Sequence, residues 1–277
     1  MDLPAKLLTG VVLVLALGLS FKAYGGDDLA INIQQVGKGD NLDLTIYQSH
    51  HNNDIFFSIG DGDNITLDLK QTGNNNEMGW ANDAPSWGSG AAWGGDIDHD
   101  DQYLRLWQHC SETTCNKNDI QFHVSYGTDN TVWWGQGYFF DGRNDTSWTL
   151  DTYDKGGHKV TIDIHGDDNS LKGFQRNCSD GTCEGHDARI YFYSDDNDGY
   201  FQQVNDGVKT LDVVTYSDGN EIDTLQQGHG TMNAIINLQG NYPTDISLTQ
   251  QGNSNQSYSL TQNCQTVGGC SVTVTQQ

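Results

Sequence analysis

The chain has 277 residues, of which 35% are hydrophobic and 10% aromatic, with 33 glycines and only 3 prolines. Aspartate and glutamate number 37 against 13 lysines and arginines, so the formal net charge is −24. This charge disfavours binding to nucleic acid and to anionic membrane surfaces, and it attracts cations such as calcium. Aromatic residues without abundant proline argue against a disordered linker and favour short strands joined by tight turns.

The first 25 residues have the layout of a secretory signal peptide. Lys6 precedes an apolar run over residues 7–19, and Ala23, Tyr24 and Gly25 follow. The run is shorter than the ~20 residues that a membrane-spanning helix needs, although an uncleaved anchor is the competing interpretation. The sequence therefore predicts a signal peptide over residues 1–25 and a secreted, extracellular mature protein without a membrane segment.

From residue 29 onward the chain repeats a short unit in which apolar and polar residues alternate and a polar turn follows. A period of two predicts a strand with one buried face. Gly, Asp and Asn end each unit, and these residues tolerate the positive φ angles of tight turns. The alternating apolar residues are Leu29, Ile31 and Ile33; Leu42, Leu44 and Ile46; Ile55, Phe57 and Ile59; Ile65, Leu67 and Leu69; Val160, Ile162 and Ile164; Ile190 and Phe192; Leu211 and Val213; Ile246 and Leu248; Tyr258 and Leu260; Val272 and Val274.

These repeats predict an all-β fold. A regular short unit favours a β-solenoid with two strands per coil and coils stacked ~4.8 Å apart, and an antiparallel sandwich is the alternative. Glutamines and asparagines that recur in each unit would then stack into hydrogen-bonded ladders, as they do in cross-β assemblies. Polar faces of ordinary antiparallel strands are the competing explanation for the same alternation.

One segment, residues 77–102, breaks the alternation and is rich in tryptophan and glycine. We expect it to be a loop that leaves the solenoid wall. The predicted organisation is a signal peptide at 1–25, N-terminal repeats at 26–76, the insertion at 77–102, divergent repeats with two cysteine-clipped turns at 103–206, and C-terminal repeats at 207–277.

Six cysteines fall in three local pairs, each of which encloses a small polar loop. In an exported protein this spacing favours disulfides that pin turns. A zinc site is the alternative, although zinc knuckles more often have a Cys-x-x-Cys spacing. The predicted pairs are Cys110 with Cys115, Cys178 with Cys183, and Cys264 with Cys270.

The chain has no nucleophile elbow, zinc-protease helix motif or phosphate-binding loop, so we expect no enzyme activity. Asp96, Asp98 and Asp100 resemble the start of a calcium-binding loop. Asp101 stands where that loop needs glycine, and Trp107 stands where it needs glutamate, so the match fails. No cofactor is predicted beyond calcium as a counter-ion.

Tryptophans are concentrated in the middle of the chain, where some could stack on sugar rings. The alternative is that they cover the core, since large aromatic side chains are mostly buried. The candidate glycan-binding residues are Trp80, Trp87, Trp93, Trp133 and Trp134.

The pattern Gln-x-Gly-x-x-Asn after an alternating strand resembles the curlin repeat of curli fibre subunits. The resemblance covers residues 29–76 and 207–277, and the stretch between them is only weakly similar. A further glutamine follows the next strand, one residue later than in the curlin pattern. The residues that carry the motif are Gln71, Gly73 and Asn76, then Gln250, Gly252 and Asn255, followed by Gln262.

The resemblance implies a secreted bacterial subunit that folds as a β-solenoid and stacks into amyloid fibres for adhesion and biofilm. It also implies an export pore, chaperones and other curlin-like subunits as partners. The paired cysteines, the tryptophan-rich insertion and the acidity depart from the family, so a minor or capping subunit stays open. The alternatives are a β-helical glycan-binding or carbohydrate-processing protein and a calcium-dependent surface-layer or virion fibre protein.

Overall fold

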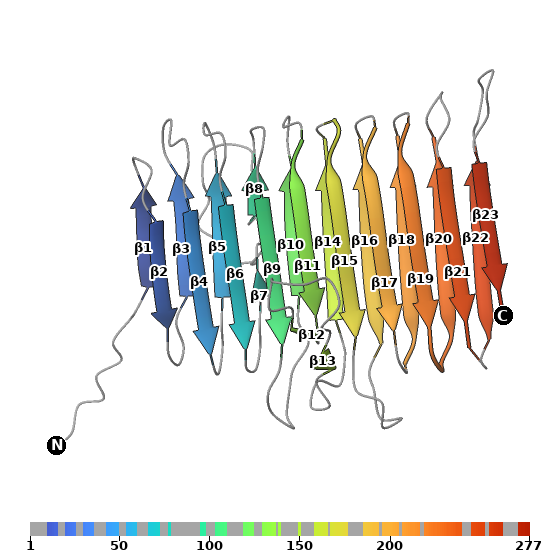
Figure 1. Cartoon of the computed structure of the whole chain (residues 1–277), viewed down its shortest axis with the longest axis horizontal. Helices are drawn as coiled ribbons and strands as arrows, with labels where there is room; N and C mark the ends of the chain where they lie inside the picture. Colours follow the sequence, from blue (N-terminus) through green and yellow to red (C-terminus); the bar gives the residue numbers. More distant parts are fainter. Residues whose placement is uncertain are drawn as a thin grey trace.

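In the computed structural model, strands follow one another in chain order along the long axis of the molecule (Figure 1). Within its described part the chain forms no helix with the length and apolar character needed to cross a membrane. The predicted all-β fold is confirmed. The structure describes residues 10–15, 20–25, 30–35, 43–49, 54–59, 66–72, 77–78, 95–97, 103–109, 119–124, 129–136, 138–139, 149–150, 158–165, 167–176, 185–193, 196–204, 207–216, 219–239, 245–252, 255–262 and 271–277.

The strands form two long parallel sheets, and each coil of the chain contributes one strand position to each of them. The prediction of a β-solenoid with two strands per coil is therefore confirmed, and the alternative of an antiparallel sandwich is wrong. The first sheet, called sheet A, has 11 strands. They are β1 (Gly10–Leu15), β3 (Ala30–Gln35), β5 (Asp54–Ile59), β7 (Glu77–Met78), β8 (Gly95–Ile97), β10 (Asp119–Val124), β14 (His158–Ile164), β16 (His186–Phe192), β18 (Lys209–Thr215), β20 (Met232–Leu238) and β22 (Gln256–Gln262).

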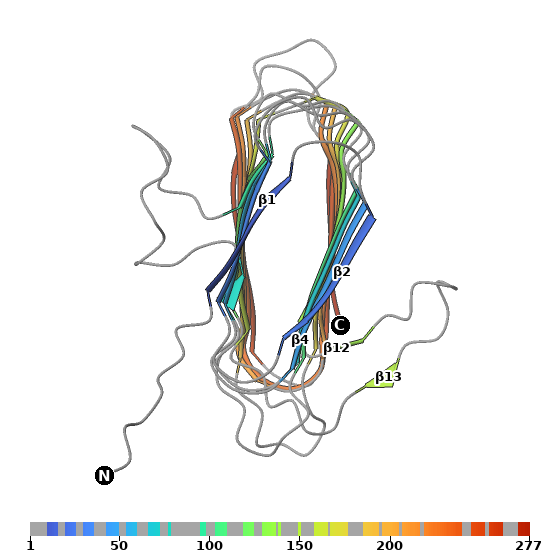
Figure 2. The ribbon, with the colours of Figure 1, turned by 90° about the vertical axis from the view of Figure 1, so that its left-hand side faces the viewer.

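The second sheet, called sheet B, has 10 strands and faces sheet A across the core (Figure 2). Its strands are β2 (Ser20–Gly25), β4 (Asp43–Ser49), β6 (Thr66–Thr72), β9 (Tyr103–His109), β11 (Thr131–Gln136), β15 (Ser170–Arg176), β17 (Asp198–Val204), β19 (Glu221–Gln227), β21 (Asp245–Gln251) and β23 (Ser271–Gln276).

The core consists of rows of apolar side chains that run along the stack. Successive strands of a sheet pair in parallel, so residues of the same kind lie beside one another from coil to coil. Ile162, Ile190, Val213 and Ile236 form one such row, and each is fully buried. The period-two pattern produces these rows because every second residue of a strand points to the same face.

Part of the predicted signal peptide is paired with the rest of the solenoid in the intact chain. β1 pairs with β3 and β2 pairs with β4, both in parallel, so these two strands make the first rung of the stack. Cleavage after residue 25 stays a prediction. Such cleavage would remove this rung and no other.

Residues 77–78 and 95–97, expected to belong to the tryptophan-rich loop, are instead strands of the solenoid wall and share one strand position. β7 and β8 both lie between β5 and β10: Met78 pairs with Ile55 and Ile120, and Ile97 pairs with Ile59 and Val124. The insertion is thus placed inside a strand, whereas long insertions more often replace a turn. Residues 79–94 lie outside the described residues.

A small antiparallel pair, β12 (Tyr138–Phe139) and β13 (Thr149–Leu150), lies beside the outer face of sheet B (Figure 2). β12 contacts β9, β11 and β15. On this face Trp107 is only 4% exposed, and a Cβ on Gly135 in the next strand would overlap its ring. The glycine leaves room for the indole to lie flat across the neighbouring strand.

Candidate assembly site

A single row of sheet B carries glutamine in nine successive strands. In each strand after β4 the glutamine Nε2 donates to the Oε1 of the glutamine in the preceding strand, at 2.7 to 3.1 Å. The ladder is buried except at its last member, and all of its hydrogen bonds have the same polarity. Its members are Gln48, Gln71, Gln108, Gln136, Gln175, Gln203, Gln226, Gln250 and Gln276.

The same amides also tie the two sheets together. The Nε2 of Gln136 donates to the carbonyl oxygen of Lys159 at 2.8 Å, and that of Gln203 donates to the carbonyl oxygen of Thr210 at 2.8 Å. Both acceptors belong to the facing sheet. Because the buried amide donates in two directions, the ladder avoids the cost of an unsatisfied polar group in the core.

A second, shorter ladder stands at the turn that leads into sheet B. Asn169 donates its backbone N–H and its Nδ2 to Oδ1 of Asn197, at 3.0 and 2.9 Å, and Asn197 does the same to Asn220, at 3.0 Å for both bonds. The residues before the last two asparagines, Asp196 and Gly219, have φ angles of 55° and 72°. These left-handed conformations turn the chain, and Asp and Gly adopt them more readily than other residues.

The curlin-like motif residues are divided between the ladder and the turns. Gln71 and Gln250 are ladder members. Gly252 follows with a φ of 157° and approaches the carbonyl oxygen of Gly228, whereas Asn255 is exposed and its carbonyl accepts the Met232 N–H at 3.1 Å. Gly73, Asn76 and the side chain of Gln262 lie outside the described residues.

Sequence reasoning missed most of the ladder. The missed members are separated from their neighbours by unequal distances along the chain, but they share a local signal. A buried residue stands four positions before most of these glutamines, as Leu104 does before Gln108 and Ile222 before Gln226. The glutamines that the motif did not find are Gln108, Gln136, Gln175, Gln203, Gln226 and Gln276.

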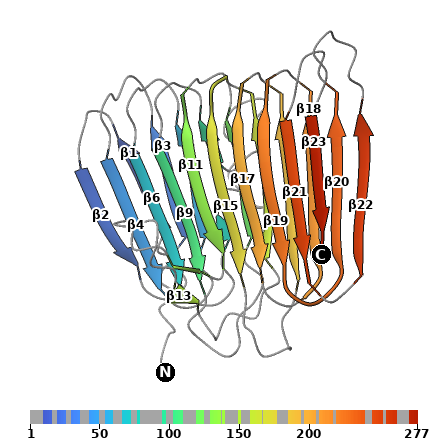
Figure 3. The ribbon, with the colours of Figure 1, turned by 45° about the vertical axis from the view of Figure 1, so that its right-hand side comes forward.

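Within the part of the chain that the structure describes, no further coil covers β22 and β23. β22 and β23 are the last strands of their sheets (Figure 3). Neither strand contains a charged residue. Val272 and Val274 are only partly buried, whereas Ile246 and Leu248 in the preceding coil are 2% and 0% exposed. Among the described residues, no strand pairs with the outer edges of β22 and β23, and the core side chains of this coil stay partly exposed.

The two adjacent candidate tryptophans lie on opposite faces of β11. Trp134 is 1% exposed and packs in the core against Phe201, with ring centroids 5.4 Å apart, so its faces are closed to a sugar. Trp133 is half-buried on the outer face, where its ring meets Tyr103 edge-on at 5.8 Å and Lys172 Nζ lies 5.0 Å from its centroid. Trp80, Trp87 and Trp93 lie outside the described residues.

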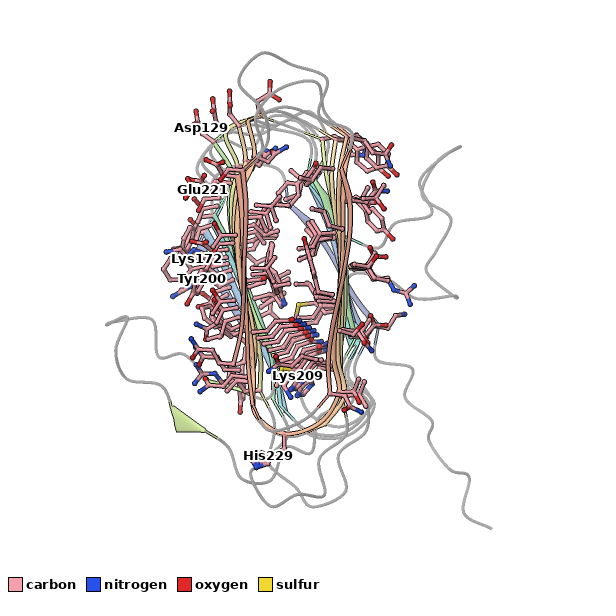
Figure 4. The ribbon with its side chains drawn as sticks, turned by 90° about the vertical axis from the view of Figure 1, so that its right-hand side faces the viewer. Asp129, Lys172, Tyr200, Lys209, Glu221 and His229 are labelled. Carbon is pink, nitrogen blue, oxygen red and sulfur yellow. The ribbon has the colours of Figure 1, made fainter. Side chains whose placement is uncertain are left out.

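An open groove of about 360 Å³ crosses the outer face of β15, β17 and β19. Lys172 and Tyr200 project from this face together with Glu221 (Figure 4). Asp198 and Asp223 complete its polar lining, so the groove carries three carboxylates against one ammonium group.

Further along this face, Arg105 forms a 2.6 Å ion pair with Asp68. Burial raises the pKa of Asp68 in spite of that partner, because desolvation outweighs the attraction. Burial also lowers the pKa of Lys70 to about 8, and the nearby Asp68 only partly opposes this effect.

A buried row of three titratable residues lies at the first positions of β14, β16 and β18 in sheet A. The rings of His158 and His186 stack with centroids 5.2 Å apart, and Lys209 follows in the next strand. Figure 4 shows Lys209 between the sheets, and its Nζ donates to the carbonyl oxygens of Gly207 and His229, at 3.1 Å each. Burial lowers the pKa of His186 well below its usual value, and the nearby His158 and Lys209 lower it further.

Neither the predicted disulfides nor a metal site is established by this geometry. All six cysteines lie outside the described residues. Among the residues that the structure does describe, no three His, Cys, Asp or Glu side chains gather as a metal site would require.

The fold and the ladders define the class of the protein as a parallel β-solenoid. Comparison of the chain with protein-family models, curated proteins and solved structures finds no match.

Proposed function

We propose that the protein is a secreted, curlin-like structural subunit whose solenoids stack end to end into extracellular amyloid-type fibres, for adhesion or biofilm matrix. The open C-terminal coil is the observation that carries this proposal. Its core residues Val272 and Val274 are half-covered, and its strands β22 and β23 are uncharged edges. Soluble proteins usually protect such edges with charges, prolines or covering loops.

A further coil stacked on β22 and β23 would supply the apolar contacts and the backbone hydrogen bonds that the last coil lacks. Covering Tyr258, Leu260, Val272 and Val274 would remove apolar surface from water, at ~25 cal/mol per Å². Both strand edges would gain backbone hydrogen bonds at the same time. Interior coils already have these contacts on both sides. Each subunit that adds to the fibre would therefore gain the same favourable free energy of apolar burial and hydrogen bonding.

In this proposal no side chain performs chemistry. The aliphatic rows and the two ladders hold each subunit rigid, and the acidic outer faces keep the fibre surface hydrated and collect cations such as calcium. An export pore, chaperones and other curlin-like subunits would be the partners, as the family resemblance implies. Disulfides at the three cysteine pairs would pin the turns.

The test is assembly of the chain from residue 26 to 277, followed by electron microscopy and fibre diffraction. Each coil of a solenoid contacts only its neighbours, so loss of the first rung leaves the other coils intact. We expect unbranched fibres with a meridional reflection near ~4.7 Å. A protein that stays monomeric at high concentration, with and without calcium, would overturn the proposal.

A matched pair of variants tests the role of the C-terminal edge. Val274→Lys places a charge in the half-covered core row of β23 and should stop assembly. Thr273→Lys places the same charge on the exposed outer face of the same strand and should leave assembly nearly unchanged. Equal inhibition by both variants would contradict stacking through this edge.

The groove on sheet B favours a second candidate function, glycan binding. Tyr200 offers a 37%-exposed ring beside Lys172 and the carboxylates of Asp198 and Asp223, a combination that suits stacking on a sugar and bonding its hydroxyls. Titration calorimetry with oligosaccharides would test it. Tyr200→Ala should abolish binding, whereas Tyr216→Ala, which alters an exposed tyrosine just after β18, should not.

A further inference from the structure

We infer that subunits join head to tail, with β22 and β23 of one copy paired to β3 and β4 of the next, and that residues 10–25 block this joint until they are removed. The inference rests on the proposed function, because it names the partner surface of the same stacking reaction. The inference is supported by four register positions, two at each end of the stack.

The first pair of positions lies in the glutamine row of sheet B. At the C-terminal end the row finishes with the exposed Gln276, and within the described residues nothing donates to its Oε1. At the other end the row starts with Gln48, which is fully buried, and the first rung places Gly25 beside it. Gly25 has no amide with which to continue the ladder, whereas Gln48 has one.

The second pair of positions lies in sheet A. The row that contains Ile164, Phe192 and Leu238 is apolar along most of its length. It has glutamine at only two register positions, Gln35 in β3 and Gln262 in β22.

The first rung determines which residue would lie beside Gln262 of an incoming copy in that row. β1 places Leu15 at the register position beside Gln35. With residues 10–25 present, a second copy would set Gln262 against Leu15 and Gln276 against Gly25. With them removed, the same approach sets Gln262 against Gln35 and Gln276 against Gln48, so that glutamine meets glutamine in both sheets.

The remaining positions of the joint are also compatible. Continuing the register sets Val272 and Val274 beside Leu44 and Ile46, which are core residues of β4. Asp43 would stand beside the neutral Ser271, so the joint brings no like charges together. In sheet A, Tyr258 would continue the row that starts with Ile31.

The polarity of the glutamine ladder favours a head-to-tail arrangement of subunits over a tail-to-tail arrangement related by a two-fold axis. From Gln71 onward, every ladder Nε2 donates to the preceding coil, so the C-terminal end offers the acceptor Gln276 Oε1, and the amide of Gln48 in the next copy is the matching donor group. A tail-to-tail joint related by a two-fold axis would pair the edge strands antiparallel, so Gln276 would not lie beside a ladder glutamine of the other copy. Head-to-tail contacts that do not close into a ring generate filaments.

This arrangement gives the intact chain a distinct behaviour. Its C-terminal end can add to the exposed β3–β4 end of a fibre made from residues 26–277, but its own first rung then closes that end. Sub-stoichiometric amounts of the intact chain should therefore arrest growth at one fibre end. Restoring glutamine with Leu15→Gln and Gly25→Gln in the intact chain should remove much of this arrest.

The first experiment measures elongation of preformed 26–277 fibres by single-fibre imaging. We expect growth at both ends with 26–277 monomer and arrest at one end when the intact 1–277 chain is added. The intact Leu15→Gln/Gly25→Gln chain should elongate at least ~10-fold faster than the intact wild-type chain, because it restores the polar match at both register positions. Equal elongation by the intact and the 26–277 chains would overturn the blocking role of residues 10–25.

The second experiment identifies the joint itself. A photo-crosslinking amino acid at position 273 of the 26–277 chain should capture the segment around Thr45 of another copy, since Thr273 would stand beside it. Intermolecular crosslinks to residues 271–277 would indicate a tail-to-tail joint. That result would overturn the inference while leaving fibre formation standing, whereas absence of fibres would overturn the proposed function as well.

Discussion

The indole ring of Trp134 in β11 lies across Gly173 of the neighbouring strand β15, so a Cβ on that glycine would overlap the ring. The absence of a side chain lets the indole reach Phe201 in the strand beyond. We expect Gly173→Ala to destabilise the protein by about 1–3 kcal/mol through overpacking. Urea denaturation would measure this loss.

A second substitution tests the cause of that loss. If the overlap with Trp134 is responsible, Trp134→Leu combined with Gly173→Ala should cost less than the sum of the two single changes. Additive losses would instead indicate that Gly173 matters for its backbone.

The glutamine ladder should be sensitive to the loss of one member. Gln226 donates to Gln203 and to the carbonyl of Asn233, and it accepts from Gln250. Gln226→Leu would remove the donor to Gln203 Oε1, at about 1–3 kcal/mol for an unsatisfied buried group, whereas Gln250 Nε2 would keep its bond to the carbonyl oxygen of Ser257. Gln227→Leu, an exposed change in the same strand, is the control and should shift the urea midpoint very little.

Stability should fall in mild acid because of His186. Its folded-state pKa lies below the ordinary value of 6.5, mainly because the ring is buried. As the pH falls through about 6.5 the unfolded chain takes up a proton that the folded chain does not, so the free energy of unfolding decreases. His158 and Lys209 face the ring and add to the effect.

The variant His186→Met should reduce this acid sensitivity. Methionine already occupies the same row at Met232, where it is fully buried. Unfolding midpoints at several pH values between 7 and 5 would give the slope for each protein. An unchanged slope in the variant would assign the acid sensitivity to other groups.

Salt should stabilise the folded protein. Asp198, Glu221 and Asp245 are exposed neighbours in one row of sheet B, so three carboxylates stand ~4.8 Å apart along the stack. Like charges in this position repel one another, and added salt screens the repulsion. The urea midpoint should rise with sodium chloride, and it should rise less in Glu221→Gln. A larger rise with calcium at equal ionic strength would support its role as a counter-ion.

Some features of the site could have been predicted from the alternation alone. Trp133 and Trp134 are adjacent in a strand, so they had to point to opposite faces, and they could never form one platform. Other features could not be predicted in this way. Trp107 is buried on an outer face because of the space above Gly135 and the contact of β12, and these segments are not its neighbours in sequence.

The sequence by itself determined the strands and their pairing into coils. The alternation of apolar residues acts over a few residues, and so do the turn residues that tolerate a positive φ. Each unit therefore specifies its own strand and turn. Leu67, Leu69 and their equivalents are in the core for this reason.

Only the tertiary structure decided which glutamines form the ladder. Neighbouring members are separated by between 23 and 39 residues, because the turns and insertions between coils differ in length. A fixed repeat cannot find residues at such unequal intervals. Parallel pairing aligns each strand with the one before it regardless of the length of the connection, and this alignment brings Gln136 and Gln175 into contact.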